Sequence, residues 1–323
     1  MTTTDHLPRP DLSGVSETLL AIEHNIHQVL RGKPEVVRLS LITLFSEGHL
    51  LVEDVPGVGK TLLARAIARS IDCSVARVQF TPDLLPSDVT GVTVYSPDSG
   101  SFEFRPGPVF ANIVLGDEIN RAGPKTQSAL LESMEERTVT IDGSTHELAR
   151  PFMVIATQNP IELEGTYPLP EAQRDRFLMR VSIGYPHQDD ELEILRTHGG
   201  TDRTRELESV TDVPAVVDAI VKIREVRVAE PIERYLIALC RATRSHPDVE
   251  LGASPRASLA LLKSGRAAAA LQGRDHVVPD DIKEVAPHVL PHRLILRPDA
   301  ELAGQDAHAV IADVLDGLPA PTS

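Results

Sequence analysis

The chain has no tryptophan, only two cysteines and few aromatic residues, and each shortage excludes a class of protein. Cys73 and Cys240 lie far apart in the sequence and cannot make a disulfide framework, so we expect a reducing cytoplasm. Aromatic residues make up 3% of the chain and the formal net charge is −15, which argues against a general nucleic-acid-binding surface. No run approaches the roughly 18 consecutive apolar residues of a membrane span. Residues 1–11 lack the basic and apolar regions of a signal peptide.

What is present is typical of a globular protein. Apolar residues make up 41% and charged residues 24% of 323 positions, enough for a proper core. That length allows one large domain or two of ordinary size.

Short apolar runs alternate with helical patterns over the first half of the chain. The apolar runs are typical of strands buried on both faces of a parallel sheet. Strands are expected at 49–53, 75–80, 112–116, 152–157 and 179–185, and helices near 19–30 and at 34–45, 61–69 and 124–136. This alternation predicts an α/β domain with a parallel sheet.

Two inserts and a change of pattern complete the expected organisation. Segments 93–104 and 138–148 carry β-forming residues around turn sequences and are expected to be hairpins that make contacts, with plain surface loops as the alternative. From residue 188 helical patterns take over, at 191–197, 213–228, 231–245, 255–271 and 279–290. The expected parts are a flexible N-terminus (1–14), an α/β core (15–187), a helical domain (188–315) and a flexible tail (316–323), with fraying over the last dozen residues.

Residues 54–61 have the composition of a phosphate-binding loop. Its glycines let backbone N–H groups approach a phosphate, Lys60 supplies a cation for the β- and γ-phosphates, and Thr61 supplies a hydroxyl for Mg²⁺. The pattern G-x-x-x-x-G-K-[ST] is met except at its first glycine, which is Asp54 here. A glycine-rich turn is the alternative, but a strand before and a helix after favour phosphate binding. The expected contacts are Pro56, Gly57, Val58, Gly59, Lys60, Thr61 and Leu62.

Polar residues follow two further strands. Asp117 and Glu118 end one of them, where Asp117 would hold Mg²⁺ through water and Glu118 would be the general base. Asn159 follows the other and is expected to hold the attacking water. A pair of solvated acids and a turn-forming asparagine before Pro160 are the alternatives. Because ligands bind at the carboxyl ends of parallel strands, the three are expected beside the same phosphates.

Four segments together resemble the MoxR family of AAA+ ATPases. They are residues 57–61, Asp-Glu-Ile-Asn-Arg-Ala at 117–122, Ala-Thr-Gln-Asn-Pro at 156–160, and Leu-Pro-Glu-Ala-Gln-Arg-Asp-Arg-Phe-Leu at 169–178. The resemblance runs from about residue 15 to about residue 315. It implies a P-loop AAA+ core of three αβα layers, a smaller all-helical lid, ATP hydrolysis with Mg²⁺, and tolerance of Asp54 in the loop.

The resemblance also implies roles for single residues. Asn159 becomes the sensor-1 residue, and Arg176 becomes the arginine finger that reaches a neighbour's γ-phosphate, with Arg174 as the alternative. Arg256 becomes the sensor-2 arginine, a surface arginine in a first helical turn being the alternative. A guanidinium group suits these roles because it spreads positive charge over a transferring phosphoryl group. The two hairpins match family inserts that face the central opening of a ring.

The family pattern further implies partners. We expect a homo-oligomeric ring, a hexamer by analogy, that remodels or matures a client complex alongside a von Willebrand factor A-domain protein, some clients containing metals. Three alternatives use the same core: a nucleic-acid-linked motor or transcription activator, a chelatase-type subunit, and a nonhydrolysing ATP-gated scaffold. The acidic charge and few aromatics argue against the first of these.

Overall fold

A parallel sheet of five strands forms the centre of the first part of the chain. The computed structural model describes residues 11–55, 57–159, 165–186, 188–197, 204 and 206–321; the expected flexible residues 1–10 and 322–323, Pro56 and Pro160 lie outside these ranges. The strand order is β2-β5-β8-β1-β9, with β1 (Leu50–Glu53), β2 (Val75–Gln79), β5 (Ile113–Asp117), β8 (Met153–Gln158) and β9 (Met179–Val181). The prediction of an α/β fold with a parallel sheet is confirmed.

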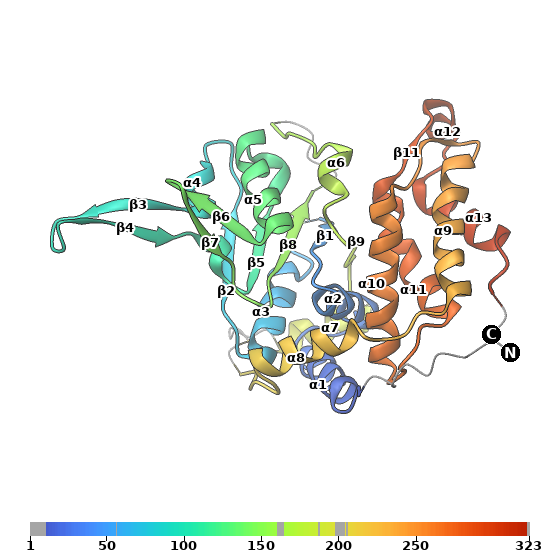
Figure 1. Cartoon of the computed structure of the whole chain (residues 1–323), viewed down its shortest axis with the longest axis horizontal. Helices are drawn as coiled ribbons and strands as arrows, with labels where there is room; N and C mark the ends of the chain where they lie inside the picture. The colour runs from blue at the N-terminus through green and yellow to red at the C-terminus, as the bar shows by residue number, and fades with distance from the viewer. Residues whose placement is uncertain are drawn as a thin grey trace, which may run out of the picture.

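Helices cover both faces of the sheet (Figure 1). Leu50 and Val52 of β1 belong to the hydrophobic cluster that includes α1 (Val15–His27), α2 (Pro34–Phe45) and α3 (Lys60–Ile71). Leu51, between them, belongs to a second cluster with α5 (Pro124–Glu136). Successive side chains of a strand point to opposite faces, so every residue of β1 needs an apolar side chain except the last.

Two hairpins leave this core at the expected places. The first, β3 (Gly91–Ser96) with β4 (Ser101–Pro106), follows α4 (Pro86–Thr90) and projects far from the rest of the chain in Figure 1. Its Tyr95 and Phe102 are exposed and meet edge to face with ring centroids 5.4 Å apart. The second, β6 (Thr138–Ile141) with β7 (Ser144–Glu147), follows α5 and is shorter.

The second part of the chain is helical. It contains α7 (Gln188–Thr197), α8 (Val213–Ile223), α9 (Glu230–Ser245), α10 (Pro255–Leu271), α11 (Pro279–Val289), α12 (Pro298–Leu302) and α13 (Ala307–Gly317). A two-stranded ribbon of β10 (Val249–Leu251) and β11 (Ile295–Leu296) joins them, which the sequence did not indicate. The expected fraying was wrong for residues 312–317, because α13 continues to Gly317 and buries Ile311 and Val314.

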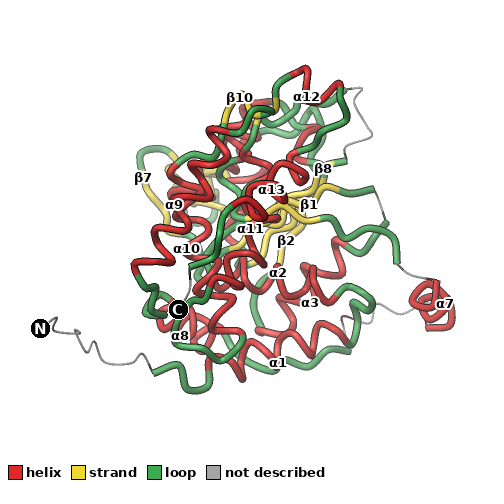
Figure 2. The backbone as a smooth tube through the Cα atoms, turned by 90° about the vertical axis from the view of Figure 1, so that its right-hand side faces the viewer, coloured by secondary structure: helices red, strands yellow, loops and turns green. Residues whose placement is uncertain are grey.

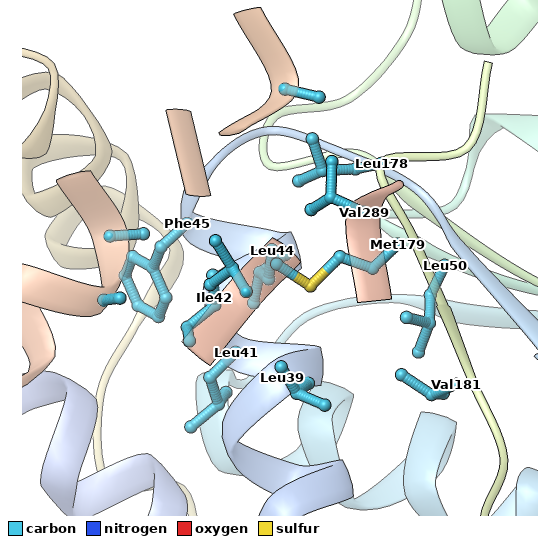
Figure 3. Packing of buried hydrophobic residues seen from close by; sticks show 14 of the residues in the cluster. Leu39, Leu41, Ile42, Leu44, Phe45, Leu50, Leu178, Met179, Val181 and Val289 are labelled. Carbon is cyan, nitrogen blue, oxygen red and sulfur yellow. The ribbon is translucent and has the colours of Figure 1, made fainter. Parts of the chain in front are cut away.

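Apolar packing joins the helical part to the sheet. Figure 3 shows Val289 of α11 beside Leu178, which precedes β9, and Met179, its first residue. The side chains of α2 lie next to them. Residues from α2, β9 and α11 therefore share one continuous cluster, and α8 also lies against α1 and α2. None of the helices within the described ranges combines the length and apolar character needed to cross a membrane.

Candidate functional site

The turn between β1 and α3 has the backbone form of an anion-binding loop. Gly57 and Gly59 have φ angles of 86° and 106°, in the left-handed region that side chains other than glycine rarely adopt. Gly59 is the N-cap of α3, so Lys60, Thr61 and Leu62 occupy its first turn. The first N–H groups of a helix lack intrahelical acceptors and carry partial positive charge, which favours an anion here.

Lys60 is held inside this loop. Its Nζ donates to the carbonyl oxygen of Asp54 at 2.7 Å, and the residue is only 9% exposed. Burial lowers the pKa of the Lys60 ammonium, and the charges of Asp54, Asp117 and Glu118 act in the opposite direction. The cation therefore faces three acidic residues at one edge of the sheet.

Asp54 explains why the loop departs from the usual pattern. One oxygen of its carboxylate accepts from Ser182 Oγ at 3.1 Å, from the N–H of Ile183 at 2.5 Å and from the N–H of Gly184 at 2.8 Å. The other oxygen accepts from the N–H of Val55. These bonds turn the chain away after Val181, so β9 ends there and not at residue 185 as the sequence predicted.

Asp117 and Glu118 end β5 beside the loop. Glu118 has a φ of 57°, a left-handed conformation that is uncommon for a residue with a side chain. The hydroxyl of Thr157, on neighbouring β8, accepts from the N–H of Glu118 at 2.9 Å and donates to Asp117 Oδ1 at 3.0 Å. Thr157 thus fixes the positions of both acidic residues. Backbone strain such as the left-handed conformation of Glu118 is concentrated at functional sites.

Two side chains of β2, together with Arg121, donate hydrogen bonds to these acids. Arg77 Nε donates to Asp117 Oδ2 at 2.8 Å, and Gln79 Nε2 donates to Glu118 Oε2 at 3.0 Å. Arg121 Nη1 also donates to Glu118 Oε2 at 3.0 Å. The sequence did not single out Arg77, Gln79 or Thr157. The only available signal was the two-residue spacing of 77 and 79 on an expected strand, which puts both on one face.

One cavity of about 390 Å³ brings most of the predicted residues together. It is lined by Gly57, Gly59, Lys60, Thr61, Leu62, Arg77, Gln79, Asp117, Glu118, Thr157 and Asn159. Among the predicted loop residues, Val58 packs partly buried against the core, and Pro56 lies outside the described residues. Phosphate-binding backbone, a cation, two acids and an amide therefore face a single space.

The same cavity has a donor set that fits Mg²⁺. The ion prefers oxygen ligands and commonly takes one or two from protein while keeping waters and phosphate oxygens. The Thr61 hydroxyl and the Asp117 carboxylate are oxygens of that kind on one cavity wall. Arg77 binds Asp117 Oδ2 and would compete with such an ion for this carboxylate.

Arg176 and Arg256 lie elsewhere. Both line a second cavity with residues that precede β1, such as His49, whereas the phosphate loop follows β1. The four residues of β1 rise about 3.3 Å each, so roughly 13 Å of strand separates the two edges. Glu135 of α5 binds both arginines, Arg176 Nη2 at 3.0 Å and Arg256 Nη2 at 2.6 Å. The structure thus brings these two together and keeps them from the loop of their own subunit.

Arg174 takes a different direction from Arg176. It lines a cavity of about 520 Å³ together with Asn159 and Glu171, beside the carboxyl end of β8. Its guanidinium lies 3.5 Å from Glu171, and its buried Nε has no hydrogen-bond partner in the described structure. The two candidate finger residues are therefore on different faces of the chain.

A buried arginine fixes the segment that carries Arg176. Arg293, just after α11, has a side chain only 3% exposed and donates to Asp175 Oδ1 at 2.7 Å. Its other nitrogens donate to the carbonyl oxygens of Phe177 at 2.6 Å and Leu178 at 3.2 Å. The helical part of the chain thereby holds the segment that carries Arg176, a contact that nothing in the sequence pattern had indicated.

Comparison with known proteins gives consistent matches over nearly the whole chain. Residues 49–179 match the family described as ATPase family associated with various cellular activities (AAA), and residues 241–314 match the AAA lid domain. The chain is 51% identical to the uncharacterized protein YeaC of Bacillus subtilis over 93% of this chain and 94% of that protein. It is 41% identical to chaperone MoxR1 of Mycobacterium tuberculosis, over 97% and 86%. A solved structure of a candidate ATPase from Cytophaga hutchinsonii superposes with a TM-score of 0.90 at 38% identity, over 95% of this chain and 96% of that one.

Proposed function

The chain belongs to the MoxR family of AAA+ ATPases, and we propose that it couples ATP hydrolysis in a ring of identical subunits to the remodelling of protein complexes. It is an ATP hydrolase with an AAA+ core and a lid domain. Support for a chaperone-like role comes from its similarity to chaperone MoxR1. Its relatives over nearly full length favour this role over a chelatase-type subunit or a nucleic-acid motor.

One observation carries the catalytic proposal: the phosphate loop, Lys60, Asp117, Glu118 and Asn159 line one cavity. In this proposal the loop N–H groups and Lys60 bind the phosphates, while Thr61 and, through water, Asp117 would hold Mg²⁺. Bound Mg²⁺ would supply positive charge to the phosphate oxygens.

Glu118 acts as the general base. It takes a proton from a water that Asn159 orients, the water oxygen bonds to the γ-phosphorus, and the bond from that phosphorus to the bridging oxygen breaks. ADP and inorganic phosphate leave. Gln79 and Arg121 both bind Glu118 Oε2 here, so the proton would go to Oε1 or require these bonds to be released.

Arg176 and Arg256 complete the site of a neighbouring subunit. They share one face with Glu135, at the opposite edge of the sheet from their own phosphate loop. Two guanidinium groups side by side suit a γ-phosphate better than one, because more of its charge is compensated. Arg174, which lies beside Asn159, is the less suitable finger.

The assembly and its partners extend this proposal. We take the ring to be a hexamer in the cytoplasm, with the two hairpins toward its opening, a client complex as substrate and a von Willebrand factor A-domain protein as co-factor. The domains are taken to be a core over residues 15–187 and a lid over 188–315.

Two variants test the catalytic site directly. Glu118→Gln should bind ATP with wild-type affinity in calorimetry and lose nearly all turnover, since it keeps the shape of the site but removes the base. Lys60→Ala should lose binding itself, because a principal phosphate contact is removed. Full turnover by Glu118→Gln would contradict the assignment of the base.

A mixing experiment tests the contribution of the neighbour. Arg176→Ala has an intact base and Glu118→Gln has an intact finger, so each should be inactive alone. Mixed in equal amounts, they form about a quarter of interfaces with both groups present and should recover turnover. If the mixture stays as inactive as its components although mixed rings form, Arg176 does not act across the interface.

The remodelling role needs its own test. Glu118→Gln retains nucleotide, so crosslinking it in lysate with ATP should enrich a protein complex that Lys60→Ala does not. Candidate complexes are then assayed for activation by the wild-type chain with ATP. ATPase activity that rises with DNA and falls with salt would favour a nucleic-acid motor instead.

A further inference from the structure

Asp54 joins the phosphate loop to the segment that follows β9, and the proposed mechanism leaves these two parts separate. Its carboxylate is nearly buried, with the residue 7% exposed, and it accepts four hydrogen bonds. Three of these come from consecutive residues, Ser182, Ile183 and Gly184, and the fourth from Val55. Burial of a carboxylate costs free energy unless the group is hydrogen-bonded, and these four bonds offset that cost.

The main chain of Asp54 belongs to the phosphate loop. Its carbonyl oxygen is the acceptor for Lys60 Nζ at 2.7 Å, and its N–H donates to the carbonyl oxygen of Gln158 at 3.1 Å. A phosphate that binds Lys60 draws on the same ammonium group as the Asp54 carbonyl. Occupation of the loop therefore acts on a direct bonding partner of Asp54.

The segment that Asp54 holds is the start of the connection to the lid. Ile183 is buried in the core, the carbonyl oxygen of Tyr185 accepts from Lys33 Nζ at 2.7 Å, and α7 begins at Gln188. The Asp190 carboxylate packs against Gly32, so close that a Cβ at Gly32 would lie 2.0 Å from it. Figure 2 shows the rest of α7 standing away from the other helices.

We propose that Asp54 is a positioning residue that transmits occupation of the phosphate loop to the connection between core and lid. When Lys60 moves to the phosphates, the peptide after Asp54 is freed from its bond to Lys60. The carboxylate shifts with it, and Ser182, Ile183 and Gly184 follow, which moves the start of α7. A glycine, the usual residue here, has no side chain for this role. This inference rests on the proposed function, because it needs ATP in the loop.

Hydrogen exchange in α7 tests the proposal. Its amides form no bond to Asp54, so a loss of the direct bonds alone does not alter them. In the full-length wild-type chain, a nonhydrolysable ATP analogue with Mg²⁺ should change exchange in peptides covering 188–197 by about tenfold. Asp54→Gly should keep nucleotide affinity within about threefold, lose this response, and lower kcat with little change in KM.

Two further variants separate coupling from structural damage. Asp54→Asn should give an intermediate response, because its amide nitrogen must face an N–H donor on one side. Glu53→Gln is the matched control: the same type of change one residue away, at a carboxylate that binds Arg180 and has no bond to the 182–184 segment. It should respond as the wild type does. If Asp54→Gly does not fold, Asp54→Asn decides.

The outcomes are distinct for the two proposals. A wild-type chain that binds no adenine nucleotide contradicts the proposed function. A wild-type chain that binds nucleotide without any change in α7 overturns the coupling alone. So does an Asp54 variant that binds nucleotide and shows the full wild-type response in α7 and kcat.

Discussion

Each acid of the proposed catalytic site is bound to a side chain that competes with its proposed role. Asp117 forms an ion pair with Arg77, and the guanidinium group binds the carboxylate that a divalent cation would also bind. Arg77 is about half exposed, so its ion pair is screened and contributes about 1 kcal/mol or less. The pair nevertheless opposes Mg²⁺ directly, because both cations need Asp117.

Replacing Arg77 should therefore make Mg²⁺ binding easier. Arg77→Gln is expected to lower the half-saturating Mg²⁺ concentration for ATPase activity by about two- to fivefold, the equivalent of losing the ion pair. A titration of Mg²⁺ at saturating ATP measures this. Arg241→Gln, the same change at an exposed arginine that does not line the cavity, is the control. A higher Mg²⁺ requirement in Arg77→Gln would mean that Arg77 helps to bind the nucleotide.

His49 gives the fold a pH dependence below neutrality. Burial lowers the pKa of His49 from 6.5 to about 4. Its Nε2 lies 3.0 Å from the Met134 carbonyl oxygen, and its Nδ1 accepts from the N–H of Val154 at 3.0 Å. The unfolded chain takes up the proton near pH 6.5 and the folded chain only near pH 4. The stability that neutral His49 provides is complete above pH 6.5 and is lost as the pH falls toward 4, on the order of 3 kcal/mol.

His49→Gln isolates this contribution, because a glutamine amide can make the same two bonds without titrating. The variant should lose less free energy of unfolding than the wild type between pH 6.5 and 4.5, measured by urea denaturation at each pH. Equal slopes for the two proteins in that interval would contradict the assignment. Other buried histidines affect both proteins alike and cancel in the comparison.

The residues that could be predicted are those whose chemistry is local in the sequence. Lys60 and Thr61 follow two glycines in the loop, and Asp117 and Glu118 follow an apolar strand, so each was found without knowing the strand order. Arg77 and Glu135 could not be found in this way. They meet Asp117 and Arg176 only because β2 lies beside β5 and the end of α5 lies beside the segment that precedes β9.

The same distinction between local signals and long-range contacts holds for the secondary structure. The expected starts of α2, α5 and α10 agree with the structure, because proline in the first turn marks where each helix begins. β10 and β11 are three and two residues long, too short for any periodicity to show. β9 is shorter than expected because Asp54 takes the N–H groups of Ile183 and Gly184, a long-range contact.

The contact between Arg293 of the lid and the segment that carries Arg176 should contribute strongly to the free energy of unfolding. Arg293→Met leaves the carboxylate of Asp175 with only Ser254 Oγ among its described side-chain partners, at 3.2 Å. Removing one partner of a buried ion pair typically costs about 3–5 kcal/mol. Urea unfolding should show a loss of this size, whereas exposed Arg297→Met should change stability by less than about 0.5 kcal/mol.

The long hairpin is expected to behave differently. Tyr95 and Phe102 are exposed, and an aromatic pair of this kind contributes about 0.5–1.5 kcal/mol at most. Replacing both with alanine should leave the thermal midpoint of unfolding within a few degrees of the wild type. Functions that depend on the ring of subunits should be impaired. A large loss of stability would mean that the hairpin is part of the folded core and not a contact element.

For the whole molecule, the separation of Arg176 from its own phosphate loop predicts that turnover depends on assembly. Activity per subunit should rise with protein concentration until ring formation is complete, as sedimentation measures it, while ATP affinity changes little. Absence of a finger reduces phosphoryl transfer by about 10³–10⁵ in comparable enzymes, so dilute subunits should be nearly inactive. Constant activity at concentrations where only monomers sediment would contradict this.

Glu135 of the core binds Arg256 of the lid at this face, beside the bonds that Asp175 makes with Arg293 and Ser254. Its carboxylate binds Arg176 from the core and Arg256 from the lid helix α10, and its side chain is 34% exposed. A rotation of the lid that moves α10 away from α5 therefore breaks the ion pair between Glu135 and Arg256. Dissolved salt weakens such pairs over the distance at which counter-ions screen them, about 8 Å at physiological ionic strength. The ionic strength of the medium thus sets how readily an unassembled subunit exposes its two arginines.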